Sequence, residues 1–183
     1  HQPTLGESLP PVEPKRMRRS RLYLPGNEAK YMLNAALHQP DGIILDLEDS
    51  VAPAAKFDAR AMVRHALHCL DFGDCERMVR INQGEMGRED LAYLGDAPFH
   101  MVLIPKVETA EEIQALEPIV EGRDLLFMPI IESARGVINA DAIAQASPRI
   151  VALTLGLEDL TADLGVVKTA GGMESAFACS WVI

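Results

Sequence analysis

The alternation of short apolar runs with helix-like segments restricts the fold of this chain more than any other feature. The apolar runs lie within 21–27, 42–50, 77–82, 101–106, 125–131 and 150–155, and helical spacing recurs between them, as over 28–39, 54–70, 108–120 and 134–146. Strands that alternate with helices form a parallel sheet whose faces those helices cover. We therefore predict an α/β protein built on a parallel sheet.

Two topologies fit this pattern, a doubly wound sheet and a (β/α) barrel. A doubly wound nucleotide-binding fold carries GxGxxG after its first strand, whereas this chain reads LPGNEAK at that place. We favour a (β/α)8 TIM-barrel type. A closed barrel typically needs ~250 residues, and the chain has 183 residues with about six β/α units, so the predicted barrel is incomplete. Residues 1–18, rich in Pro and polar side chains, are predicted to be a flexible N-terminal arm, and 19–183 the partial barrel.

Composition excludes several classes of protein. The net charge of −10 argues against nucleic-acid binding, which needs clustered Lys and Arg. The three cysteines form no CxxC pattern, which suits a reducing compartment. There is no apolar run long enough for a membrane span and no apolar segment of an export signal at the amino end. We expect a cytoplasmic protein whose partners are small molecules or proteins.

Polar and charged residues follow the predicted strands where each one ends. They are Pro25, Gly26 and Asn27, then Asp46, Glu48 and Asp49, then Arg80 and Asn82, then Pro105 and Lys106, then Glu132 and Ser133, and finally Glu158 and Asp159. Strand-to-loop junctions are often polar for no functional reason. In a (β/α) barrel, however, the active groups sit at the carboxyl ends of the strands, so we expect a functional site at this rim.

One residue conflicts with the predicted sheet. Pro129 lies inside the run 125–131, and a proline removes a hydrogen-bond donor from a central strand. We expect a bulge at Pro129 or an earlier end of that strand.

The fifth and sixth runs indicate a metal pair. Glu132 follows the fifth run, Glu158 and Asp159 follow the sixth, and the helix-like 134–146 lies between them. Such a unit joins parallel neighbours ~4.8 Å apart, so carboxylates at their carboxyl ends can share a small cation such as magnesium, which prefers oxygen ligands. The alternative is that these acids offset the positive ends of the helices that follow. Spacing alone does not choose between Glu158 and Asp159.

Several segments together match a known family. RSRLYLPGN, GIILDLEDSVAPAAKFDAR, VRIN, LIPKVETAEEI, IIESARGVINADAIA and LGLEDLTADLG, in this order, resemble the citrate lyase β-subunit-like branch of the HpcH/HpaI aldolase family over roughly residues 19–178. The combination of LDLEDS, IES and GLED carries the specificity. The resemblance implies a (β/α)8 barrel and a carbon–carbon lyase. Such an enzyme cleaves or forms 3-hydroxyacyl thioesters of citryl-, malyl- or citramalyl-CoA type.

The resemblance also implies roles for individual residues. Glu132 and Asp159 match the family's Mg²⁺ ligands, which selects Asp159 over Glu158, and Arg80 with Glu132 matches its substrate-binding residues. Cleavage develops negative charge on a thioester enolate and releases a 2-oxo acid. A chelated Mg²⁺ can act as Lewis acid and template by binding the 2-oxo acid. The Arg80 guanidinium can bind a carboxylate or enolate oxygen.

The acids of the LDLEDS segment complete the predicted site. We assign Glu48 and Asp49 to the catalytic group with Arg80, and expect them, with Asp46, to hold Arg80 or a metal-bound water. A purely structural ion network is the alternative. Lys56 either anchors that network or is solvated.

Two departures from the family pattern leave other functions open. The chain ends inside the sixth helix-like segment, before two further strands and before the family's C-terminal catalytic Asp, so we expect a fragment or truncated product. The alternatives to a thioester lyase are a class II-type aldolase on free 2-oxo acids and a non-catalytic assembly subunit of a lyase complex. The expected partners are a small 2-oxo acid and an acyl-CoA or acyl carrier protein thioester, in a homo-oligomer of three or more subunits, with neither nucleic acid nor membrane.

Overall fold

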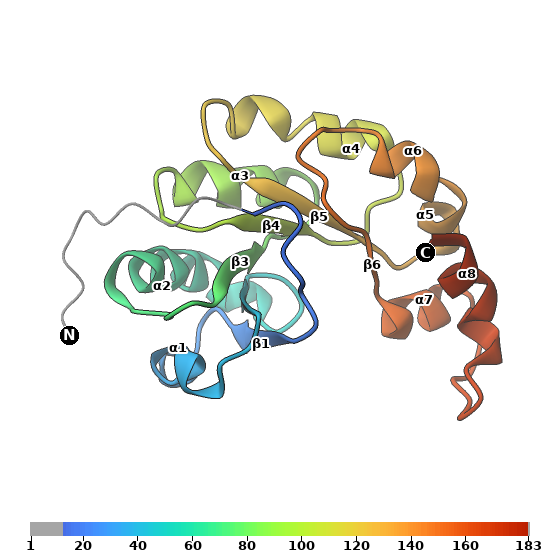
Figure 1. Ribbon diagram of the computed structural model, residues 1–183, viewed down its shortest axis with the longest axis horizontal. Helices are drawn as coiled ribbons and strands as arrows, with labels where there is room; N and C mark the ends of the chain where they lie inside the picture. Colours follow the sequence, from blue (N-terminus) through green and yellow to red (C-terminus); the bar gives the residue numbers. More distant parts are fainter. Residues whose placement is uncertain (1–12, 183) are drawn as a thin grey trace.

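A computed structural model describes residues 13–182, and its centre is a parallel sheet of six strands in the order β1-β2-β3-β4-β5-β6 (Figure 1). The strands are β1 Arg21–Pro25, β2 Gly42–Asp46, β3 Glu76–Arg80, β4 Met101–Ile104, β5 Leu126–Ile131 and β6 Thr154–Leu155. The α-helices are α1 Ala29–Leu33, α2 Lys56–Cys69, α3 Gly84–Leu94, α4 Ala110–Gln114, α5 Ala134–Ile138, α6 Ala140–Ala144, α7 Leu157–Asp163 and α8 Ala176–Val182. Short 3₁₀ helices span Ala35–His38, Pro53–Ala55, Glu117–Ile119 and Met173–Ser175.

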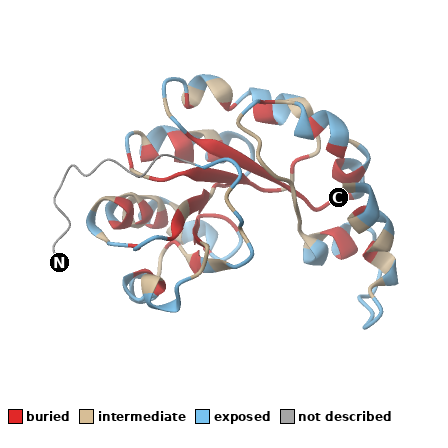
Figure 2. Ribbon diagram, viewed as in Figure 1, coloured by how far each residue is buried: buried red, intermediate tan, exposed pale blue. Residues whose placement is uncertain are grey.

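The strands β2, β4 and β5 are buried on both faces, as the continuous apolar runs predict (Figure 2). Alternate residues of each strand point to opposite faces. Ile43 and Phe127 belong to a large cluster that includes helix residues such as Leu67, and the helices pass around the outside of the curved sheet. Ile44 and Met128 belong to a second cluster on the other face. The predicted α/β architecture, a partial (β/α) barrel, is confirmed.

The expected bulge or early end at Pro129 is wrong, because β5 continues through Pro129 to Ile131. The N–H of Phe127 donates to Arg149 O at 2.8 Å, and the Phe127 carbonyl accepts from Val151 N at 3.3 Å. Pro129, two residues further on, faces the same neighbour but has no N–H to donate. The interruption therefore falls on the sixth strand, which is predicted at 150–155 but is found only at Thr154–Leu155 after an isolated bridge between Phe127 and Ile150.

The helix-like segment 134–146 forms two short helices, α5 and α6, instead of one. Asn139 lies between them with φ −91° and ψ 5°. Its side chain donates to the Glu108 carbonyl at 2.8 Å, and this contact joins the junction of the two helices to the loop after β4.

The amino-terminal segment reaches the sheet through arginine side chains. Residues 1–12 of the predicted arm lie outside the described residues. In the remaining part, Arg16 donates to the Asp74 carbonyl at 2.6 Å, and the Arg18 guanidinium pairs with the buried Glu76 at 2.5 and 2.7 Å. Residues 16–18 are thus held against the amino end of β3.

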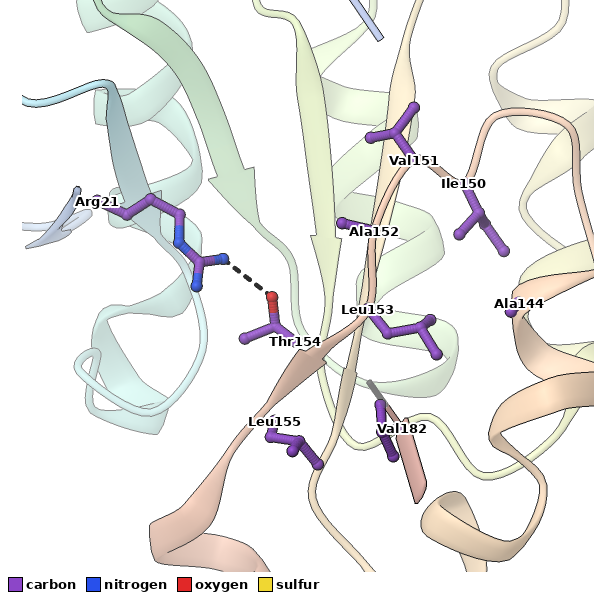
Figure 3. Close-up of a pocket in the computed structure, with 9 residues that line it drawn as sticks. All are labelled: Arg21, Ala144, Ile150, Val151, Ala152, Leu153, Thr154, Leu155 and Val182. Atoms are coloured by element: carbon purple, nitrogen blue, oxygen red, sulfur yellow. Dashed lines mark hydrogen bonds between the residues drawn. The ribbon is translucent and has the colours of Figure 1, made fainter. Parts of the chain in front are cut away.

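The two outer strands of the sheet, β1 and β6, face each other across a cavity of about 640 Å³ (Figure 3). The Arg21 guanidinium of β1 spans this gap and donates to Thr154 Oγ1 of β6 at 2.9 Å. The same Arg21 nitrogen lies 2.9 Å from Met128 Sδ. Side chains of Leu153 and of Val182 in α8 also line the cavity. A side-chain hydrogen bond therefore links β1 to β6 where no strand pairing joins them in the described part of the chain.

Candidate active site at the carboxyl end of the sheet

An ion pair between neighbouring strands forms the base of the site. Asp46 at the end of β2 lies in register with Arg80 at the end of β3. Arg80 Nε and Nη2 each donate to one oxygen of the Asp46 carboxylate at 2.6 Å, a bidentate pair. Burial raises the pKa of Asp46, but hydrogen bonds from Arg80 and Ser50 outweigh it and lower that pKa overall. Burial likewise lowers the pKa of Arg80, but Asp46 and Glu48 raise it above its ordinary value, so Arg80 stays charged.

The loop after β2 is fixed by its own side chains and by α2. Asp46 accepts hydrogen bonds from the backbone N–H of Glu48 at 2.9 Å and of Ser50 at 3.1 Å. Lys56, the first residue of α2, donates to the carbonyls of Leu47 at 2.8 Å and Glu48 at 2.6 Å. Lys56 is therefore the anchor of this loop and not a solvated lysine.

Glu48 and Asp49 extend this network toward solvent. Glu48 is buried, and its Oε2 lies 3.2 Å from Arg80 Nη1. Asp49 is half exposed, with Oδ2 3.9 Å from the same nitrogen. The predicted association of Glu48 and Asp49 with Arg80 is thus present in the structure.

Lys106, which follows β4, connects this network to the two predicted metal ligands. Its ammonium nitrogen lies 3.4 Å from Glu48 Oε1, 3.6 Å from Asp49 Oδ1 and 3.4 Å from Asp159 Oδ2. Its backbone N–H donates to Glu132 Oε1 at 2.8 Å. Burial lowers the pKa of Lys106, but the carboxylates of Glu48, Asp49 and Asp159 outweigh burial and raise it.

Glu132 follows β5 and points to the neighbouring strand end instead of capping the helix after it. The cap of α5 is Ser133, whose hydroxyl accepts from the Gly136 N–H at 3.1 Å. Burial raises the pKa of Glu132 to about 7; the Lys106 N–H opposes this shift, and the negative charges of Asp159 and Glu48 add to it. A buried carboxylate with one hydrogen bond and acidic neighbours is an environment that a cation would stabilise.

Asp159 and Glu158 diverge although they are adjacent in the first turn of α7. Asp159 faces Lys106, whereas the exposed Glu158 pairs with Lys168. Sequence spacing does not distinguish these two acids as candidate metal ligands, but their side chains point in different directions. Only Asp159 joins the network that contains Glu132.

The residues between 13 and 182 contain no cluster of three or more His, Cys, Asp and Glu side chains arranged to hold a metal ion. Any metal at this rim would need ligands from water or substrate beside the protein carboxylates.

No helix within residues 13–182 is long and apolar enough to cross a membrane.

Comparison with known proteins fits this arrangement. A family model described as HpcH/HpaI aldolase/citrate lyase matches residues 19–183. The chain belongs to the HpcH/HpaI aldolase/citrate lyase family. The family resemblance of its sequence motifs is thereby confirmed.

Members of the HpcH/HpaI family similar to this chain carry two kinds of name. The chain is 35% identical over 175 residues to "Citrate lyase subunit beta" of Leuconostoc mesenteroides subsp. cremoris, covering 90% of the chain and 58% of that protein. It is 39% identical over 149 residues to "(3S)-malyl-CoA thioesterase" of Cereibacter sphaeroides, covering 80% of the chain and 51% of that protein. The chain thus spans little more than half the length of these relatives.

A solved HpcH/HpaI family structure supports the fold. The citrate lyase beta subunit of M. tuberculosis, complexed with oxaloacetate and magnesium, superposes with a TM-score of 0.74 at 31% identity, covering 90% of this chain and 73% of that one.

Sequence reasoning missed three contacts of the site. Lys106 is named among the rim residues but receives no role, and its φ of 51° is not visible in the sequence. The Tyr23 ring lies 5.2 Å from the Arg80 guanidinium carbon, and Gln83 donates to Glu48 Oε1 at 3.0 Å. The sequence carries no signal for the Tyr23 contact, because it depends on the registers of β1 with β2 and of β2 with β3.

Proposed function

We propose that this chain carries the metal- and substrate-binding part of a magnesium-dependent carbon–carbon lyase. The reaction is cleavage or formation of a 3-hydroxyacyl thioester of citryl-, malyl- or citramalyl-CoA type, with CoA or an acyl carrier protein as the thiol. One observation carries the proposal: the carboxylates of Glu132 and Asp159 both contact Lys106, beside the Arg80 ion pair at the same rim. The names of the relatives and the oxaloacetate and magnesium of the solved homologue support the same chemistry.

The donor set fits magnesium. Glu132 and Asp159 offer the hard oxygen ligands that this ion takes, and one or two carboxylates completed by water and substrate oxygens are its common protein site. Burial raises the pKa of Glu132, the acidic neighbours Asp159 and Glu48 add to the shift, and the negative charges of these neighbours also favour a cation at this place. When bound, magnesium supplies a Lewis acid that polarises the 2-oxo acid.

Arg80 is proposed to bind a substrate carboxylate or enolate oxygen. The Asp46 carboxylate accepts hydrogen bonds from two N–H groups of the Arg80 guanidinium. The orientation of the guanidinium is therefore set before any substrate binds. Removing one preorganised donor of this kind typically costs ~10²–10³ in rate. Glu48 and Asp49 act with Arg80 as positioning groups through Nη1.

Titration calorimetry with magnesium and oxaloacetate tests the proposed ligands. The Glu132→Gln and Asp159→Asn variants should lose magnesium binding, and oxaloacetate binding should lose its dependence on magnesium. Glu158→Gln is the matched control, because it removes an acid of the same helix turn that pairs with Lys168 instead. Unchanged magnesium binding in the first two variants would refute the assignment.

The reaction class is tested by mass spectrometry of products formed from malyl-CoA, citramalyl-CoA and the free hydroxy acids. Cleavage of the thioesters alone supports the proposal. Cleavage of free acids identifies the class II-type aldolase, and magnesium binding without any product identifies the non-catalytic assembly subunit. We further propose that the protein is a cytoplasmic homo-oligomer of three or more subunits. Light scattering of the purified protein checks the number of subunits.

A further inference from the structure

The Lys106 ammonium occupies the centre of the acidic rim. It lies 3.4 to 3.6 Å from carboxylate oxygens of Glu48, Asp49 and Asp159. The first two acids lie in the loop after β2, and Asp159 lies in α7. Glu48 is nearly inaccessible, whereas the Lys106 and Asp159 side chains are 34% and 38% exposed. The contacts of Lys106 with Asp49 and Asp159 are therefore closer to solvent than its contact with Glu48, and of these two acids only Asp159 belongs to the proposed metal pair.

The backbone at Lys106 is held in an unfavourable conformation. Its φ of 51° lies in the left-handed region, which residues other than Gly, Asn and Asp adopt at a cost. In this conformation its N–H donates to Glu132 Oε1 at 2.8 Å while the ammonium reaches Asp159. One residue thus contacts both carboxylates of the proposed metal pair, through two different atoms.

We propose that Lys106 is the built-in counter-cation of the metal site: its ammonium neutralises Asp159 and Glu48 in the metal-free protein and competes with the divalent cation for Asp159. This inference rests on the proposed function, because it takes Glu132 and Asp159 as the ligands. An oxygen of Asp159 that pairs with the ammonium is less available to a metal, and two cations in one pocket repel each other. Lys106 therefore weakens magnesium binding and keeps the acidic rim together without it.

The Lys106→Asn variant tests the competition, since Asn removes the charge and tolerates a positive φ. We expect about a tenfold lower dissociation constant for magnesium by calorimetry, because each of several partly exposed ion pairs contributes about two- to fivefold. The melting temperature of the metal-free protein should fall, and saturating magnesium should restore it. A purely structural role predicts the opposite sign, weaker magnesium binding.

Two controls separate charge from other effects. Lys168→Asn removes the same charge from a pair with the neighbouring Glu158 and should leave the magnesium affinity unchanged. Lys106→Arg keeps the charge at the strained position and should keep an affinity near that of the natural protein. Equal or weaker magnesium binding in Lys106→Asn, or equal tightening in Lys106→Arg, would overturn the inference.

The same titration distinguishes this inference from the proposed function. If magnesium binds and Glu132→Gln abolishes binding, the metal pair stands, and the sign of the Lys106→Asn effect alone decides the role of Lys106. If no variant binds magnesium, both the metal pair and the competition are wrong.

Discussion

A methyl group at Gly156 should displace the proposed metal ligand Glu132. Gly156 precedes α7, and its N–H donates to the Ile131 carbonyl at 3.0 Å, so its backbone lies against the end of β5. A Cβ at this position would lie 2.2 Å from Glu132 Oε2 and 2.9 Å from Glu132 Cβ. Ordinary contacts need ~3.5 Å or more. In the Gly156→Ala variant the carboxylate must therefore move by roughly 1 Å.

A shift of that size is large for a metal site, where ligand distances are held within about 0.2 Å. Glu132 cannot simply rotate away, because it is buried and its Cβ is also too close. We expect magnesium affinity to fall by about 10- to 100-fold, the range typical of lost ligand orientation. Overpacking should also lower the free energy of unfolding by about 1–3 kcal/mol.

Calorimetric magnesium titration and urea unfolding measure the two effects separately. Gly171→Ala is the matched control, because a Cβ there meets nothing within 4 Å. Gly156→Ala protein that binds magnesium with unaltered affinity would show that Glu132 does not ligate it, or that the pocket yields more than the contacts imply.

Three further outcomes are expected. The pKa of Glu132 is raised to about 7, so the folded, metal-free protein holds a proton that the unfolded chain releases near the usual value of 4.5. The free energy of unfolding should therefore fall as pH rises from 4.5 to 7, while magnesium affinity rises over the same interval; urea unfolding and calorimetry at several pH values measure this, and Glu132→Gln should flatten the unfolding profile. Arg80→Lys breaks the bidentate contact with the buried Asp46 and should lower the free energy of unfolding by about 1–3 kcal/mol in urea, whereas Arg88→Lys in the exposed pair of Arg88 with Glu85 should change it by less than about 0.5 kcal/mol; equal effects would contradict the argument from burial. Lys56→Met leaves two loop carbonyls without their donor and should cost about 1–3 kcal/mol by the same assay, and a loss near zero would mean that water replaces the ammonium.

The sequence was sufficient to predict the parallel sheet, because continuous apolar runs separated by helical spacing leave few other architectures. It also predicted the rim, since the apolar residues of three runs give way to Asp46, Arg80 and Glu132. The consequence of Pro129 was assigned to the wrong strand. Which neighbour loses a hydrogen bond depends on the side that the missing N–H faces, and that side is set by the register with β4 and β6.

Within the site, the direction of side chains could not be read from spacing. Glu158 and Asp159 are adjacent, and only the start of α7 at Leu157 turns the second of them toward Lys106. The role of Lys106 was equally hidden, because it depends on a left-handed backbone turn that neither composition nor periodicity reveals. Family resemblance selected Asp159, whereas local physics alone did not.

The order of the strands along the sheet repeats their order along the chain, and this has a consequence for synthesis on the ribosome. Each β/α unit can dock on the one before it as soon as it emerges, without waiting for a distant partner. The Arg80–Asp46 pair can therefore form early, from the second and third strands. Glu132 and Asp159 arrive only with the fifth and sixth units, so a nascent chain acquires its proposed substrate-binding arginine before its proposed magnesium ligands.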